Sequence, residues 1–256
     1  MTNVLTECVD GRFRITLNRP QKRNALDTKA VAQFSEALDA IDQHERPRVV
    51  LIEGIGPAFC AGRDLADPAF EQMAPGDALR EYFNPLVERI LGLSVPTVAA
   101  VRGPALGAGL GIALACDVMV VSENARFGSP FGRLGGVLDC GGHVLLHERI
   151  GPALTRDLIL TGRLLDGHEA VAAGIATRCV ADDILAETAE QIANQIGHGP
   201  TAAFAQSKAI LRALSPLVHE VLELEACAQD AVADTDDVAE GLAAFRERRD
   251  PTFEGR

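Results

Sequence analysis

Apolar and polar residues alternate along this chain in patterns that predict strands and helices in a regular order. Short apolar runs at 48–53, 97–102 and 117–121 are typical of buried strands. Between the start of the chain and the first of these runs, apolar residues recur every three or four positions from Asp27 to about Gln43, which predicts an amphipathic helix capped by Asp27. Strands that alternate with helices predict an α/β fold.

The first turn of the chain has the strongest local signal. Residues 4–9 and 13–17 are strand-like and flank Asp10-Gly11, the dipeptide that most strongly favours a β-hairpin. The chain is therefore expected to open with two antiparallel strands.

The second half of the chain is mostly helical in pattern, with a boundary at Gly197 to Pro200. We expect a core at 1–198 that contains the site, followed by a helical region at 199–256. Helices are predicted near 78–92, 143–149, 152–160, 167–173, 184–196, 201–213, 216–233 and 236–248, with one short strand at 177–180.

Two loops of small residues follow two of the predicted strands. They are Phe59-Cys-Ala-Gly-Arg-Asp-Leu65 and Gly103-Pro-Ala-Leu-Gly-Ala-Gly-Leu-Gly111. Small residues after a strand let a ligand approach the backbone closely, and two converging loops can offer two N–H groups to one oxygen, as in an oxyanion hole. The alternative is tight packing of glycines inside an α/β core.

Composition narrows the class of protein. The chain has 256 residues, 47% of them hydrophobic, and a formal net charge of −12, which argues against binding to nucleic acid or to an anionic membrane. Its six cysteines are scattered without C-x-x-C spacing, so neither a zinc site nor a redox pair is expected. The N-terminus lacks the pattern of a signal peptide, and no apolar run is long enough to span a membrane. These features predict a soluble, cytoplasmic protein.

At this point the motifs, in their order and spacing, resemble the crotonase superfamily, the enoyl-CoA hydratases and isomerases, over nearly the whole chain. Besides the two loops, the resemblance includes the segments Leu17 to Leu26, Ala115-Cys-Asp117, Ala125-Arg-Phe-Gly128, Leu160-Thr-Gly162 and Glu240 to Phe245. It implies a spiral of ββα units with a C-terminal helical trimerisation region, and assembly as a homotrimer or a dimer of trimers. It also implies an acyl-CoA thioester substrate, with coenzyme A as part of the substrate and no separate cofactor or metal.

By motif position, the resemblance also implies which residues bind the substrate. The backbone N–H groups of Ala61 and Ala108 would hold the thioester oxygen, although Ala108 stands where the family usually has glycine. The coenzyme A moiety would lie near Ala25, Leu26, Arg63, Asp64 and Leu65, with Phe245 and Arg248 contributed by the tail, often that of a neighbouring subunit. Arg63 would meet a phosphate, or it is simply a solvated loop charge.

The residue expected to transfer protons differs from those used by hydratases of the family. Hydratases of the family use two glutamates, and their positions here hold Gly111 and Phe131, neither of which can handle a proton. Asp139 remains as the candidate acid/base, in a stretch similar to that of dienoyl-CoA and epoxyphenylacetyl-CoA isomerases. Its apolar neighbours are expected to raise its pKa. The alternative is that Asp139 caps the helix beginning near Gly141.

Three functions therefore stay open, in this order: a double-bond isomerase working through Asp139, an enoyl-CoA hydratase, and a non-catalytic acyl-CoA-binding protein. The spacing of Asp139, His143 and His147 can suit a metal, but we expect helix-surface or core histidines instead. Cys60 and Cys140 lack a visible activating base and are expected to be small packing residues.

Overall fold

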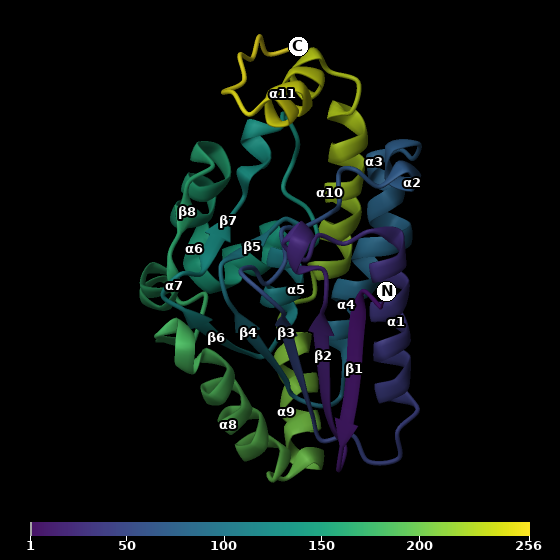
Figure 1. Cartoon of the computed structure of the whole chain (residues 1–256), viewed down its shortest axis with the longest axis vertical. Coiled ribbons are helices and arrows are strands. Elements are labelled where there is room, and N and C mark those ends of the chain that lie inside the picture. The colour runs from purple at the N-terminus through teal and green to yellow at the C-terminus, as the bar shows by residue number, and fades with distance from the viewer. Residues whose placement is uncertain (1) are drawn as a thin grey trace.

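The computed structural model describes residues 2–256, and its centre is a six-stranded sheet (Figure 1). The first two strands are antiparallel, and every later neighbouring pair is parallel. The strands lie in the order β1 (Val4–Val9), β2 (Arg12–Leu17), β3 (Val49–Gly54), β4 (Thr97–Val101), β6 (Val118–Ser122) and β9 (Arg178–Val180).

The predicted hairpin is confirmed. Asp10 and Gly11 have φ angles of 51° and 75°, and they join β1 to β2. Positive φ at both central residues matches the twist of antiparallel strands, and Asp-Gly tolerates it at low cost.

Helices cover both faces of the sheet. On one face α1 (Thr28–Asp42), α4 (Asn84–Gly92) and α5 (Ala108–Ala115) share the large apolar core, while α8 (Leu185–Gly197) packs against the other face. Asp27 caps α1 as predicted, because its side chain accepts a hydrogen bond from the Ala30 N–H at 2.7 Å. Such a cap is worth about 1 kcal/mol.

A second, three-stranded sheet was not predicted from the sequence. It contains β5 (Pro104–Leu106), β7 (Arg126–Gly128) and β8 (Leu164–Leu165). Strands this short carry no recognisable alternation, and tertiary contacts rather than local pattern create them. This small sheet matters because β5 leads directly into α5, and so orients the second small-residue loop.

The remaining elements connect these layers. The predicted helices at 143–149 and 152–160 are the two halves of α6 (Gly142–Thr161), which bends at Gly151, where φ is 70°. The other connecting elements are η1 (Pro20–Lys22), α2 (Pro68–Glu71), α3 (Pro75–Ala78), the π-helical turn η2 (Leu79–Phe83), η3 (Pro130–Arg133), α7 (Gly167–Ala173) and η4 (Asp182–Ile184).

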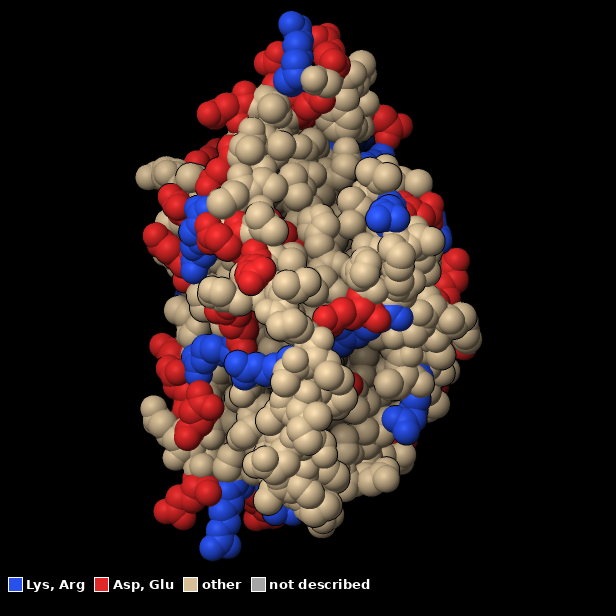
Figure 2. Space-filling view, turned by 180° about the vertical axis from the view of Figure 1, so that it is seen from behind, with Lys and Arg blue, Asp and Glu red and all other residues tan. Residues whose placement is uncertain are grey.

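The last three helices are α9 (Thr201–Ala213), α10 (Val218–Val232) and α11 (Asp236–Glu247). Figure 1 shows α11 at one end of the molecule and α10 running from it along α3, and contacts link α10 to α3, η2 and α6. By contrast, α9 buries none of its residues. On the face in Figure 2, a broad uncharged area lies between charged side chains gathered mainly toward the margins. Within residues 2–256, no helix combines the length and apolar character that crossing a bilayer requires.

Candidate active site

The two small-residue loops lie side by side, as the sequence predicts. Cys60 and Ala105 form a parallel bridge, in which the Cys60 N–H donates to the Pro104 carbonyl and the Leu106 N–H donates to the Cys60 carbonyl, both at 3.0 Å. A Cβ placed on Gly62 would lie 3.6 Å from the Ala108 nitrogen and 2.9 Å from the Leu106 carbonyl oxygen. Only glycine at position 62 allows this approach, because its φ of 96° is also unfavourable for other residues.

The amide expected to be free on the first loop is not free. The Ala61 N–H donates to the Arg23 carbonyl at 3.0 Å, so the assignment of Ala61 as an oxyanion donor is wrong. The residues on either side of Arg63 both pair with Leu26, because the Gly62 carbonyl accepts from the Leu26 N–H and the Asp64 N–H donates to the Leu26 carbonyl. The N–H of Arg63 itself has no hydrogen-bond partner within residues 2–256. Arg63 therefore offers an unpaired backbone donor in this loop, and the residue lines the cavity described below.

On the second loop, the amide of Ala108 is unpaired within residues 2–256, which is compatible with the expected role as a donor. Ala108 is the first residue of α5, and its N–H makes no backbone hydrogen bond in the part of the chain described. The first N–H groups of a helix lack an intrahelical partner and carry its positive dipole end. One cavity of about 570 Å³ is lined by Arg63, Ala108 and Asp139, among other residues.

Asp139 is buried in this cavity with one oxygen unpaired and with no cation in an ion pair with it within residues 2–256. The residue is 9% exposed, and Oδ1 has no hydrogen-bond partner within residues 2–256. Burial, followed by the negative charge of Glu225, raises the pKa of Asp139 to about 7. The alternative role as a helix cap is not observed, because α6 receives no side-chain cap from its own N-terminal residue and the Asp139 carboxylate bonds to none of its amides.

Glu225 on α10 performs the capping role instead, and the sequence reading missed it. Glu225 is 2% exposed, and its carboxylate accepts hydrogen bonds from the Gly141 N–H at 2.7 Å and the His143 N–H at 3.1 Å. A polar residue on the apolar stripe of α10, between Leu222 and Ala226, was the available signal. Residues of α10 and α11 also line the cavity, so the site extends beyond the predicted 1–198 core.

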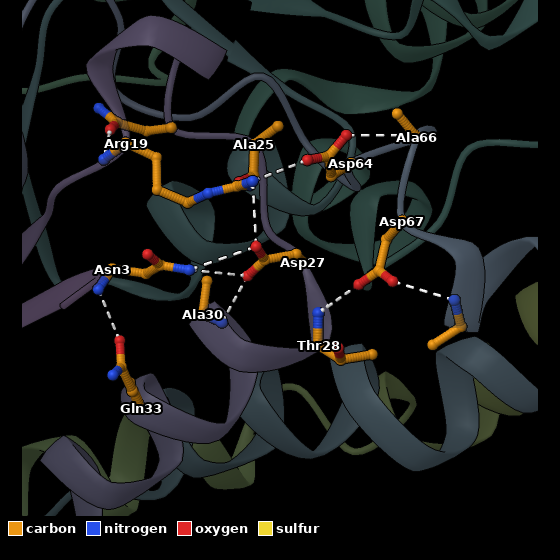
Figure 3. Close-up of polar contacts among 12 residues, drawn as sticks. Asn3, Arg19, Ala25, Asp27, Thr28, Ala30, Gln33, Asp64, Ala66 and Asp67 are labelled. Atoms are coloured by element: carbon orange, nitrogen blue, oxygen red, sulfur yellow. Dashed lines mark hydrogen bonds and ion pairs between the residues drawn. The ribbon is translucent and has the colours of Figure 1, made fainter. Parts of the chain in front are cut away.

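Asp64 has a structural role in the segment expected to bind coenzyme A (Figure 3). One of its oxygens lies 2.9 Å from the Arg19 guanidinium, which also contacts Asp27 at 3.0 Å, and the other accepts the Ala66 N–H at 3.1 Å. Its backbone N–H and carbonyl are also engaged. No polar group of Asp64 is left free, so the structure does not favour Asp64 as a ligand-binding residue.

The other residues expected at the coenzyme A site separate into three groups. Arg63 and Leu65 line the cavity, whereas Ala25 and Leu26 are buried behind it and do not. Phe245 is 61% exposed and lies outside the cavity lining, as does Arg248 just after α11. These last two residues therefore do not reach the cavity of their own chain.

Comparison with known protein families shows to which family this chain belongs. Residues 9–256 match the family model described as enoyl-CoA hydratase/isomerase. The chain belongs to the enoyl-CoA hydratase/isomerase family. Its crotonase-like α/β fold agrees with that of an enoyl-CoA hydratase from Mycobacterium avium subsp. paratuberculosis K-10, which superposes with a TM-score of 0.89 at 30% identity and covers 98% of each chain.

Relatives within the enoyl-CoA hydratase/isomerase family have different names. The chain is 34% identical over 261 residues to 1,2-epoxyphenylacetyl-CoA isomerase of Escherichia coli K12, with 100% of both chains covered. It is 36% identical over 258 residues to probable enoyl-CoA hydratase 2, mitochondrial, of Arabidopsis thaliana, with 99% of this chain and 85% of the relative covered. Sequence similarity alone therefore does not select between isomerase and hydratase.

Of the two positions at which the sequence comparison expected hydratase glutamates, Gly111 has no room for a side chain, and Phe131 carries an apolar one. A Cβ on Gly111 would lie 2.4 Å from the Cys140 carbonyl oxygen and 2.6 Å from the Cys140 Cβ. Phe131 lines the cavity as an apolar wall. Four carboxylates line the cavity, Glu71, Asp139, Asp230 and Asp234, and of these Asp139 is the buried one. Asp230 is occupied by Arg80 at 3.0 Å and the Gly76 N–H at 2.6 Å, and Glu71 and Asp234 are exposed.

The thiols near the site are not reactive groups. Burial raises the pKa of Cys60 to about 12, and burial also raises that of Cys140 well above its ordinary value. Thiols of this kind stay neutral and act as small packing residues. Within residues 2–256, no three His, Cys, Asp or Glu side chains are grouped to hold a metal ion.

Proposed function

We propose that this chain is an acyl-CoA isomerase that moves a double bond by proton transfer through Asp139. The observation that carries the proposal is the coexistence, in one cavity, of two unpaired backbone amides and one buried carboxylate with a free oxygen. These groups suffice for making and discharging an enolate, and within residues 2–256 the cavity lining holds no second buried carboxylate that could activate water.

The reaction follows from the chemistry of these groups. The N–H groups of Arg63 and Ala108 donate to the thioester oxygen, and the Asp139 carboxylate removes a proton from the acyl chain. The C–H electron pair becomes part of a dienolate, and the new O–H on Asp139 then returns the proton to a different carbon. One preorganised donor of this kind is worth about 3–4 kcal/mol in the transition state.

The raised pKa of Asp139 suits this cycle. A carboxyl with a pKa of about 7 is a stronger base than an exposed aspartate and still releases the proton within the same turnover.

The closed position at Gly111 argues against the alternative of a hydratase. Hydration needs one group to activate water and another to manage the α-proton, and within residues 2–256 Asp139 is the one buried carboxylate of the cavity lining, whereas Glu71 and Asp234 are exposed to solvent. The name of the Escherichia coli relative, an isomerase, agrees with this choice. A silent acyl-CoA-binding protein has no need to hold an unpartnered carboxylate in its cavity, because burying one destabilises the fold.

The coenzyme A end of the substrate is proposed to lie at the mouth formed by Arg63 and Leu65. Exposed Phe245 and Arg248 of an adjacent copy would complete it, which requires a homotrimer or a dimer of trimers. We propose a cytoplasmic enzyme without a separate cofactor.

The test is an assay of the purified protein with 2-enoyl-, 3-enoyl- and dienoyl-CoA thioesters, with products separated by chromatography and identified by mass. We expect isomers of unchanged mass, and loss of turnover in Asp139→Asn with coenzyme A affinity retained. Asp183→Asn, an exposed aspartate, is the matched control. A product heavier by one water would establish the hydratase, and tight binding of all three thioesters without turnover would establish the silent binder.

A further inference from the structure

Glu225 is a buried acid that does not line the cavity, yet it reaches the loop that carries Asp139. Besides the Gly141 and His143 amides, its Oε1 lies 2.8 Å from His143 Nδ1. The His143 side chain is 35% exposed, while that of Glu225 is 2% exposed. All the contacts of this carboxylate are therefore to residues that follow Asp139 by two to four positions.

A second residue of α10 holds the other side of the same loop. Gln229, one helical turn beyond Glu225, donates from Nε2 to the Val137 carbonyl at 2.6 Å and accepts from the Val137 N–H at 3.4 Å. Asp139 lies between the two anchored points. Asp139 Oδ1 has no partner within residues 2–256, and the side-chain hydrogen bonds of this carboxylate are to Cys140 of the same loop and to Gln229, so its orientation depends on the loop and on α10.

We propose that Glu225 is a positioning residue that fixes the Asp139 loop and supplies the negative charge that keeps Asp139 basic. The inference rests on the proposed function and deepens it, because it assigns the proton-transfer properties of the site to a helix of the C-terminal region. Gln229 shares the mechanical part of this role but carries no charge.

The charges around Asp139 determine the sign of the effect. Arg63, from the first small-residue loop, lowers the pKa of Asp139, while Glu225, from α10, raises it. The neighbouring Cys140 thiol is neutral, and its hydrogen bond acts in the same direction as Arg63. His143, on α6, faces Glu225. Of these groups, Glu225 is the anion that opposes ionisation of Asp139.

The test is the pH dependence of kcat/KM for isomerisation in wild type and Glu225→Gln. Glutamine removes the charge and keeps one acceptor oxygen, so it can still accept from one of the two loop amides, which donate to separate oxygens of Glu225. A base that acts when deprotonated gives activity that rises with pH through its pKa, so the acid limb in Glu225→Gln is expected to move to lower pH by roughly one unit. Glu220→Gln, an exposed residue of the same helix, is the control and should leave the limb in place.

A folded, active Glu225→Gln enzyme with an unshifted acid limb would overturn the proposal, because a purely structural cap would change stability alone. If Glu225→Gln does not fold, Glu225→Asp retains the charge on a shorter side chain. It should lower kcat while keeping the wild-type acid limb, and unchanged kcat would overturn the positioning role.

A measurement that needs no turnover separates this inference from the proposed function. The difference in unfolding free energy between Asp139 and Asp139→Asn proteins, followed against pH, reports the pKa of Asp139 directly. If no thioester is isomerised, the proposed function fails. The inference about Glu225 still holds in that case only if the Glu225→Gln background lowers this pKa.

Discussion

Asp139 is expected to destabilise the folded protein, and replacing it with asparagine tests this directly. The carboxyl has a pKa of about 7 in the folded chain, against 3.8 for an ordinary aspartate. Each pKa unit corresponds to about 1.4 kcal/mol, so the charged form costs up to about 4 kcal/mol of folding free energy at pH 8.

The sign of the pH dependence follows from proton binding. Between pH 3.8 and about 7, the folded state holds a proton on Asp139 that the unfolded state has released, so stability falls as the pH rises through this window and then levels off. Asp139→Asn carries no charge at any pH. Its stability advantage over wild type should therefore be largest at pH 8 and fall to less than half at pH 5.

The measurement is urea unfolding of both proteins at pH 8 and pH 5, at equal protein concentration because assembly also contributes to stability. Asp183→Asn, on the surface, should show no such pH-dependent gain. An Asp139→Asn protein that gains no more at pH 8 than at pH 5 would refute the assignment of a strained, buried carboxylate. The same variant should be inactive, so the charge that catalysis needs is the one that the fold would be better without.

Two further predictions follow from close packing and from surface exposure. Gly111→Ala should destabilise the protein by about 1–3 kcal/mol in urea unfolding, although alanine favours helix, because its Cβ would lie 2.4 Å from the Cys140 carbonyl oxygen. Gly132→Ala, whose Cβ would meet nothing closer than 3.7 Å, is the control, and equal costs at the two sites would contradict the packing argument. The protein should elute with the mass of three or six chains in light-scattering chromatography, and Leu214→Glu should weaken this assembly, because Leu214 is 73% exposed at the end of a helix with no buried residue. A monomeric wild-type protein would contradict the proposed trimer.

Local pattern was sufficient for most of the fold. Asp10-Gly11 predicted the hairpin, the apolar stripe from Ala30 to Ile41 predicted α1, and the helices of the C-terminal region fall within a few residues of their predicted limits. Each of these signals lies within one element, so neighbouring residues contain the information. Strands β5, β7 and β8 have two or three residues each, and pairing across the fold creates them, so no local pattern could reveal them.

The site was predictable to a similar degree and for the same reason. The two loops, Ala108 and Asp139 were found from their motifs, and the structure brings them to one cavity. The error at Ala61 came from assigning the donor by motif position, whereas its amide is taken up by Arg23, a contact that sequence does not display. The contact between Glu225 and Gly141 joins positions 84 residues apart, so only folding reveals it.

The hydrogen bonds between α10 and the Asp139 loop have a consequence for folding during biosynthesis. A nascent polypeptide that has emerged only as far as α8 already has every strand of both sheets, together with the two amides and Asp139 itself. Because domains form progressively from the N-terminal end during translation, such an intermediate can assemble its core early. It still lacks α10, whose Gln229 and Glu225 hold Val137 and Gly141. The Asp139 loop is therefore expected to reach its active conformation only late, after α10 has left the ribosome and docked.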